Sequence, residues 1–81
     1  MTVTVRLFAR ARDLAGAESV SLDLPGPATV ADLRRGLARS HPALGEFLPR
    51  CAVSVNGEFA ADADAVPAGA EVAVLPPVSG G

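Results

Sequence analysis

The sequence predicts a single α+β domain in which a mixed sheet of about five strands is covered by one main helix. Stretches near both ends of the chain alternate between apolar and polar residues, which is typical of half-buried strands. A stretch between them has apolar residues at helical spacing. The length of 81 residues is that of one domain, and an apolar content of 49% is enough for a core. We therefore expect one domain over residues 1–81.

The N-terminal part of the chain predicts a β-hairpin. Residues 2–8 alternate, with valine and leucine on one face and Phe8 at the end of the other. Residues 18–24 alternate again, and the segment Pro25–Pro27 ends this second strand. Residues 9–17 carry three charged side chains and a glycine, so we expect a loop between the two strands.

One main helix is predicted after the hairpin. Thr29 is the expected N-cap, and Asp32 is its partner in a capping box. Pro42 ends the helix, because a proline disfavours the helical conformation of the residue before it. The apolar stripe that would face the sheet consists of Val30, Leu33 and Leu37.

The remaining strands follow the helix. Residues 51–55 alternate, and Asn56-Gly57 is a strong signal for a type I′ turn into a returning strand with Phe59. Residues 71–75 form the last strand, with two valines on one face and Leu75 on the other. Together with the hairpin and the helical crossover, these strands complete a mixed sheet with one face covered by the helix.

The other face of the sheet is predicted to bind a protein. It would carry Arg6, Phe8, Ala73 and Leu75, which makes it too apolar to be simply solvated. Phe59, on the returning strand, is a further candidate. If the alternation were shifted by one residue, the same side chains would lie in the core instead.

Charge and cysteine content exclude several classes of function. Seven basic and nine acidic residues leave a net charge of −2, which offers no electrostatic attraction to nucleic acid or to an anionic membrane. A single cysteine excludes a disulfide framework and a zinc site built from cysteines. Apolar runs fall far short of the ~20 residues that span a bilayer, and the N-terminus lacks the layout of a signal peptide. We expect a small, soluble, cytoplasmic domain.

No side chain predicts a self-contained active site or a metal site. His41 and Cys51 are the only residues of their kind and have no evident partners. Cys51 alternates with two valines, which places it in the core. Residues 62–64 lack the further ligands of a calcium loop, so a solvated loop is expected there. The sequence is more typical of a protein on which enzymes act than of an enzyme.

The C-terminus is the most informative feature of the sequence. It ends in Gly80-Gly81, and a carboxylate flanked by residues without a Cβ can enter a narrow tunnel. Residues 76–81 span about 20 Å when extended, at ~3.3 Å per residue. The chain end could thus be presented inside another protein while the folded part stays outside. An inert, frayed terminus is the alternative interpretation.

Three segments of the chain carry a resemblance to a known family. The segment EVAVLPPVSGG, residues 71–81, resembles the C-terminus of the sulfur-carrier small subunits of molybdopterin synthase. The pattern FAxxRDLxG over residues 8–16 resembles the family's first strand and loop, and Val55-Asn56 resembles its middle strand. The resemblance covers essentially the whole chain and implies a β-grasp, ubiquitin-like fold with a flexible C-terminal Gly-Gly tail. Two departures are Leu75, where these proteins often carry phenylalanine, and the Asn56-Gly57 turn.

The resemblance implies that the chemistry takes place at Gly81. Its carboxylate would be adenylated by an activating enzyme akin to ubiquitin-activating enzymes, so AMP would be bound transiently and no cofactor stably. A sulfur donor would replace AMP and leave a C-terminal thiocarboxylate. The tail, residues 77–81, would then deliver this sulfur to cyclic pyranopterin monophosphate to form molybdopterin. The residues inserted into a large partner subunit ahead of Gly81 would be Pro77, Val78, Ser79 and Gly80.

The same resemblance implies how the work is divided between the subunits. The catalytic residues would belong to the large subunit, and this chain would be its non-catalytic sulfur donor. The complex would be a heterotetramer with small and large chains in equal number. The contacts that the folded part would make with this partner are Phe8, Arg12, Phe59 and Leu75.

Other functions stay open. A related carrier could supply sulfur for thiazole or cysteine, although the Pro-Pro-Val segment before the glycines favours molybdopterin. A ubiquitin-like modifier would be joined through Gly81 to lysines of target proteins. Because this chain has no lysine, such a modifier could not build chains on itself. A plain binding module with an inert tail is the last alternative.

Overall fold

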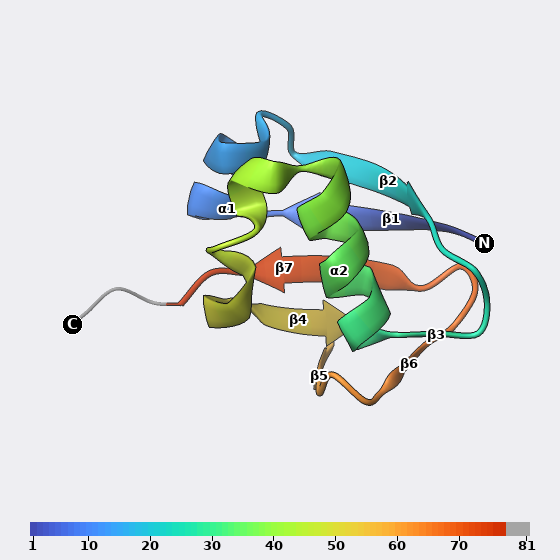
Figure 1. Cartoon of the computed structure of the whole chain (residues 1–81). Coiled ribbons are helices and arrows are strands. Elements are labelled where there is room, and N and C mark those ends of the chain that lie inside the picture. Colours follow the sequence, from blue (N-terminus) through green and yellow to red (C-terminus); the bar gives the residue numbers. More distant parts are fainter. Residues whose placement is uncertain (78–81) are drawn as a thin grey trace.

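The computed structural model describes residues 1–77 as a mixed β-sheet with helices packed against one face (Figure 1). The five-stranded sheet and the main helix that crosses it confirm the predicted architecture. No helix within residues 1–77 is long and apolar enough to cross a membrane. In chain order the elements are β1 (Thr2–Leu7), α1 (Ala9–Ala15), β2 (Ser19–Asp23), β3 (Ala28–Thr29), α2 (Val30–Ser40), the 3-10 turns η1 (Pro42–Leu44) and η2 (Leu48–Arg50), β4 (Ala52–Val55), β5 (Glu58–Ala60), β6 (Ala65–Val66) and β7 (Glu71–Leu75).

The strand order of the sheet is β2-β1-β7-β4-β5, whereas β3 and β6 pair separately. The first and last strands, β1 and β7, run parallel in the centre, with Thr4 opposite Glu71 and Leu7 opposite Val74. The other neighbours in this sheet are antiparallel. Parallel strands need a crossover connection, which here includes α2. The core lies between the sheet and α2, and its largest fully buried side chains are Leu33, Leu37, Leu44 and Leu48.

Helix α2 begins with the predicted capping box. The Thr29 hydroxyl accepts a hydrogen bond from the Asp32 amide (3.3 Å), and the Asp32 carboxylate accepts one from the Thr29 amide (2.9 Å). The bond from the Thr29 amide, helped by one from Arg35, lowers the pKa of the Asp32 carboxyl. The next two amides of the helix donate to the backbone carbonyls of Asp62 and Asp64. The loop before β6 therefore satisfies amides that a helix N-terminus leaves without partners.

Arg34 ties α2 to two other segments of the chain. Its guanidinium donates to the backbone carbonyls of Leu48 (2.6 Å) and Cys51 (3.0 Å) and to the carboxylate of Asp62 (2.8 Å). Hydrogen bonds from a charged donor are stronger than those between neutral groups. Residues 62–64 form an exposed loop, as predicted, and Asp62 in addition ties this loop to α2 through Arg34.

The turn between β4 and β5 has the predicted type I′ geometry. Asn56 and Gly57 both have positive φ angles, 51° and 83°, as this turn requires. The Asn56 amide donates to the Glu71 carbonyl (2.8 Å), and the Asn56 side-chain oxygen accepts from the Glu71 amide (2.9 Å). The turn therefore also holds the start of β7 in place.

Residues 9–15 are helical, so the prediction of a loop between the first two strands is wrong. Helix α1 ends at Gly16, whose φ of 72° allows its amide to donate to the Arg12 carbonyl. Ala11 is fully buried in the core. A helix of seven residues is marginal by itself, so packing against the rest of the molecule decides its conformation. The local sequence pattern does not contain that information.

Candidate functional site

The sheet face that α2 leaves uncovered carries apolar side chains around the end of β7. The strand register brings them together: Ala73 lies opposite Arg6 on β1 and Ser54 on β4, and Leu75 lies opposite Ala52. On the far side of β4, Ser54 in turn lies opposite Phe59 of β5. We call this surface the outer-face patch, and it consists of Phe8, Ala52, Phe59, Ala73 and Leu75.

The predicted faces of the last strand are confirmed. Val72 and Val74 are buried in the core, whereas Leu75 is half-buried on the outer face. Phe8 is 36% exposed, and the Arg6 guanidinium lies 5.4 Å from the centre of its ring, a cation–π arrangement. Phe59 is 77% exposed on the edge strand β5. These side chains are available to a partner, and their role as an interface stays a prediction.

Arg12 lies on α1 and outside the outer-face patch. Its side chain is about half exposed, and its Nε is 4.0 Å from the Asp13 carboxylate. Phe8 directly follows β1, the strand next to β7 with Leu75, and the Arg12 amide donates to the Phe8 carbonyl (3.4 Å) from the first turns of α1. A contact from Arg12 would require a partner that also covers α1.

The chain leaves the sheet beside the outer-face patch, at the end of the molecule opposite to the N-terminus (Figure 1). Strand β7 ends at Leu75, and Pro76-Pro77 cannot donate backbone hydrogen bonds, which stops the ladder. Residues 78–80 and Gly81 lie outside the described residues. Their predicted roles, as an inserted tail and as the reacting group, stay predictions.

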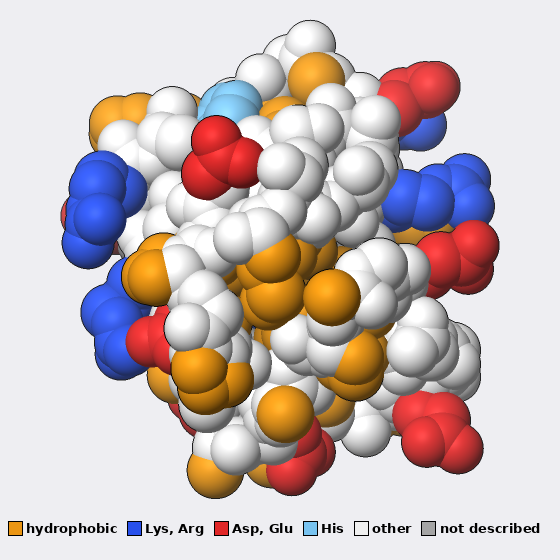
Figure 2. Space-filling model, turned by 90° about the vertical axis from the view of Figure 1, so that its right-hand side faces the viewer, with side chains coloured by type: hydrophobic (Ala, Val, Ile, Leu, Met, Phe, Trp, Pro, Cys, Tyr) orange, Lys and Arg blue, Asp and Glu red, His pale blue; other side chains and the backbone are white. Residues whose placement is uncertain are grey.

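The end of the molecule that carries the N-terminus shows no broad surface of one charge (Figure 2). In this view apolar side chains occupy the middle, and acidic and basic side chains both lie around the margin. In the part of the chain that the structure describes, no three potential metal-ligating side chains come together. The outer-face patch, next to the exit of the chain, is therefore the strongest candidate for a functional surface among residues 1–77.

Cys51 lies in the core, as predicted. It is only 5% exposed, and its thiol donates to the Phe47 carbonyl at 3.5 Å. Burial raises the pKa of this thiol, and the nearby Arg34 only partly opposes the shift. A thiol that stays protonated is a poor nucleophile. Cys51 is therefore a structural residue.

Cys51→Ala is expected to lower the free energy of unfolding by about 1 kcal/mol and to leave reactions at Gly81 unchanged, because the substitution removes a small buried group. Thermal melts and an assay of thiocarboxylate formation measure the two effects. Val53→Ala, on the same strand face, is the matched control and should cost more stability, since it removes more apolar volume. A Cys51→Ala variant that folds normally and cannot form a thiocarboxylate would contradict the structural assignment.

Both the sequence and the fold have counterparts among known proteins. The model of the ThiS family matches residues 5–81. Small archaeal modifier protein 1 of Haloferax volcanii is 43% identical, over 94% of this chain and 97% of its own length. The molybdopterin synthase sulfur carrier subunit of Chlamydomonas reinhardtii is 35% identical over 100% of both chains. The crystal structure of SAMP1 from Haloferax volcanii has a TM-score of 0.87 at 40% identity, over 100% of both chains.

Two similar structures include a partner protein. One is the complex of subunits 1 and 2 of molybdopterin-converting factor from Helicobacter pylori, with a TM-score of 0.70 at 26% identity over 100% of both chains. The other is the BexX/CysO complex of Amycolatopsis orientalis, with a TM-score of 0.79 at 25% identity over 98% of this chain and 99% of that chain. Relatives of this chain thus form complexes with other proteins.

Proposed function

The chain belongs to the ThiS family and has the β-grasp fold, and from this we propose that it carries sulfur on Gly81 for the synthesis of molybdopterin. An activating enzyme would join the Gly81 carboxylate to AMP from ATP and release pyrophosphate. A sulfur donor would then displace AMP and leave the thiocarboxylate. The observation that carries the proposal is that the family match runs through residue 81, where the chain ends in Gly-Gly.

The outer-face patch supports docking of the folded part on a large subunit. Only Pro76 separates Leu75 from the tail, residues 77–81, so a partner that receives Gly81 must pass close to Leu75. Phe8 follows β1, the strand that pairs with β7. A few apolar anchors at the centre of an interface supply most of its binding energy. In this proposal the catalytic residues belong to the partner, and this chain supplies the sulfur.

The Helicobacter pylori complex of subunits 1 and 2 supports a partner of this kind. We expect a complex with small and large chains in equal number, because each tail would occupy one active site. An adenylating enzyme and a sulfur donor are the other proteins that the proposal requires. Arg12, which lies on α1 one turn after Phe8, would contact the large subunit only if that subunit also reaches α1.

Protein modification is the second candidate function. The 43% identity to small archaeal modifier protein 1 favours it, since the match covers nearly all of both chains. Both functions begin with activation of Gly81, and they differ in what then attacks the activated carbonyl. A sulfur donor would give a carrier, and a lysine amine of a target protein would give a conjugate. Without lysine of its own, this chain would be attached singly rather than as a chain built on itself.

The mass of the intact protein purified from its native host tests the proposal. A carrier should contain a fraction that is heavier by the difference between one sulfur and one oxygen atom, located at Gly81. A modifier should instead yield branched peptides after trypsin digestion. Because Arg50 is the last basic residue, the branch on the target lysine would comprise residues 51–81. Detection of neither product in the host would contradict both functions.

A further inference from the structure

Strand β2 is an open edge of the sheet. It pairs only with β1, in an antiparallel register that places Val3 opposite Leu22. At the end of this ladder Leu24 and Met1 exchange two backbone hydrogen bonds: the Leu24 amide donates to the Met1 carbonyl (2.8 Å), and the Met1 ammonium donates to the Leu24 carbonyl (2.6 Å). This pair fixes which residues of β2 face β1.

Antiparallel ladders alternate between bonded and non-bonded pairs. The Met1–Leu24 pair is a bonded pair, so the even-numbered residues of 18–24 form the backbone hydrogen bonds to β1. At the other end of the ladder the Leu7 amide donates to the Glu18 carbonyl (2.8 Å), which agrees with this alternation. The residues whose backbone N–H and C=O groups point away from the sheet are therefore Ser19, Ser21 and Asp23.

This row of outward-pointing groups is long enough to pair with another strand. At the opposite edge of the sheet, β5 has only three residues. Among them, only Phe59 has backbone N–H and C=O groups that point away from the sheet. β2 has five residues and no proline among them. Free edges bind additional strands unless short length, proline, charge or a covering segment prevents it. β2 is thus the edge of this sheet at which strand addition is possible.

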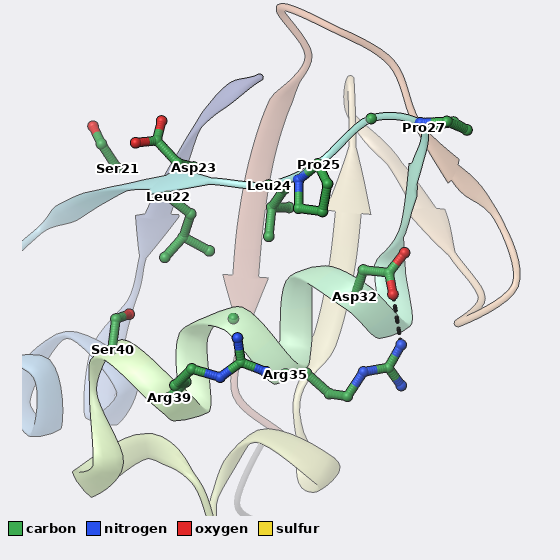
Figure 3. A pocket seen from close by; sticks show the side chains of 12 residues that line it. Ser21, Leu22, Asp23, Leu24, Pro25, Pro27, Asp32, Arg35, Arg39 and Ser40 are labelled. Carbon is green, nitrogen blue, oxygen red and sulfur yellow. Dashed lines mark hydrogen bonds and ion pairs between the residues drawn. The ribbon is translucent and has the colours of Figure 1, made fainter.

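A groove runs along β2 on the side of α2 (Figure 3). One wall is β2 with the segment that follows it, and the other is α2. The side chains of Leu22 and Leu24 point toward α2, whereas those of Ser21 and Asp23 point away from it. Gly36 lies on α2, and a Cβ there would be 3.1 Å from Cδ2 of Leu24. The β2 segment and the helix therefore approach each other closely at Gly36, and a side chain there would require the Leu24 side chain to shift.

The α2 wall of the groove carries two arginines and one acidic residue, Asp32, and so has an excess of one positive charge. Arg35 and Arg39 line it, about one helical turn apart. Arg35 pairs with Asp32 and keeps further N–H donors, and Arg39 makes no ion pair with any of residues 1–77. Asp23 does not offset this charge, since its carboxylate points away from α2 and accepts a hydrogen bond from the Thr2 hydroxyl (2.8 Å).

We propose that an extended acidic segment of a partner protein binds in this groove and adds to β2 as a further strand. Its backbone would pair with the outward-pointing groups of β2, a known mode of peptide recognition. On a strand, residues two apart face the same side about 6.7 Å from each other. Arg35 and Arg39 are about 6 Å apart along the helix axis. Two acidic residues separated by one residue would therefore meet both arginines.

A second copy of this chain fits the groove less well. Antiparallel pairing of two β2 strands would place two α2 helices on the same side of the joined sheet. Arg35 and Arg39 of one copy would then face the same residues of the other, and like charges oppose such a contact. The groove shares no residue with the outer-face patch, so this inference does not depend on the function at Gly81.

A titration of the 15N-labelled full chain with a synthetic peptide tests this inference. The probe is acetyl-Val-Thr-Glu-Val-Glu-Thr-Val-amide, and the matched control peptide has lysine in place of both glutamates. We expect saturable shifts of amide resonances that are largest at Ser19, Ser21 and Asp23, and none with the lysine peptide. Shifts that map elsewhere, equal binding of both peptides, or no shifts at the solubility limit would overturn the inference.

Two variants separate the backbone contribution from the charge contribution. Arg39→Glu is expected to weaken binding of the probe at least about fivefold, whereas Arg10→Glu on α1 should leave it unchanged. Ser21→Pro should abolish binding and keep the fold, because the amide that it removes faces away from β1. Unaltered affinity of Arg39→Glu, or shifts of the β2 amides that depend on protein concentration without peptide, would contradict the proposed occupant.

Discussion

Deletion of Gly81 is expected to abolish thiocarboxylate formation and sulfur delivery while the fold stays intact. All the proposed chemistry takes place at the terminal carboxylate, and the family match includes this residue. The buried core extends from Val3 to Val74 along the chain, so the deletion removes none of its members. The measurements are the molybdopterin formed by a synthase reconstituted with the activating enzyme, and circular dichroism melts of both proteins.

Deletion of Gly81 both moves the terminal carboxylate and removes a residue. Addition of one alanine after Gly81 moves the carboxylate without removing any residue. This variant keeps every native residue and is still expected to be inactive, because its carboxylate no longer follows Gly-Gly. An extension by one residue at the N-terminus is the matched control and should be fully active, since an amide before Met1 leaves a donor for the Leu24 carbonyl. Normal activity of the C-terminally extended variant would contradict both the carrier and the modifier function.

Leu75→Glu is expected to weaken binding to a large synthase subunit at least about thirtyfold, which corresponds to about 2 kcal/mol. Leu75 lies half-buried on the outer face beside Ala52, next to the exit of the chain. A charge at this point would lose its water at the interface without gaining a partner. The melting temperature should fall by only a few degrees, because the core residues of this strand are Val72 and Val74, and Leu75 is not one of them. Isothermal titration and thermal melts measure the two effects.

Ala63→Glu is the matched control for this prediction, since it adds the same charge at an exposed loop position. Phe8→Glu is a second variant on the outer-face patch, and its effect should be smaller because Arg6 lies close enough to pair with the new carboxylate. Wild-type affinity of Leu75→Glu with a large drop in melting temperature would show that Leu75 acts as a core residue. The outer-face patch would then not be the interface.

Much of the fold could be predicted because its signals are local. Alternation along a strand separates its two faces whatever strand lies beside it, so the outward position of Leu75 followed from its neighbours Val72 and Val74. The Thr29–Asp32 capping box and the Asn56-Gly57 turn likewise depend on residues that are close in the chain. The candidate reacting group, Gly81, was indicated by the resemblance of residues 71–81 to the C-terminus of a known family, which is again a local pattern.

Contacts between distant segments could not be predicted in the same way. Arg34 binds acceptors that lie 14, 17 and 28 residues further along the chain, and nothing in its immediate sequence distinguishes it from Arg35. Helix α1 could not be predicted because a helix of seven residues is stable only when it packs against the rest of the protein, here by burying Ala11 in the core. Arg12 is on this helix, so its position one turn after Phe8 could not be predicted either, and its role as a partner contact stays a prediction.

The strand faces, the main helix with its cap, and the Gly-Gly end at which the proposed chemistry takes place are all evident from the order of the residues along the chain. The position of β2 at the edge of the sheet, and the groove beside it that Arg35 and Arg39 line, became evident from the folded molecule alone. The physical reason is that pairing in a sheet depends on which strands become neighbours. A strand pattern states which side chains face the core, but the strand order decides which backbone groups remain free to bind a partner.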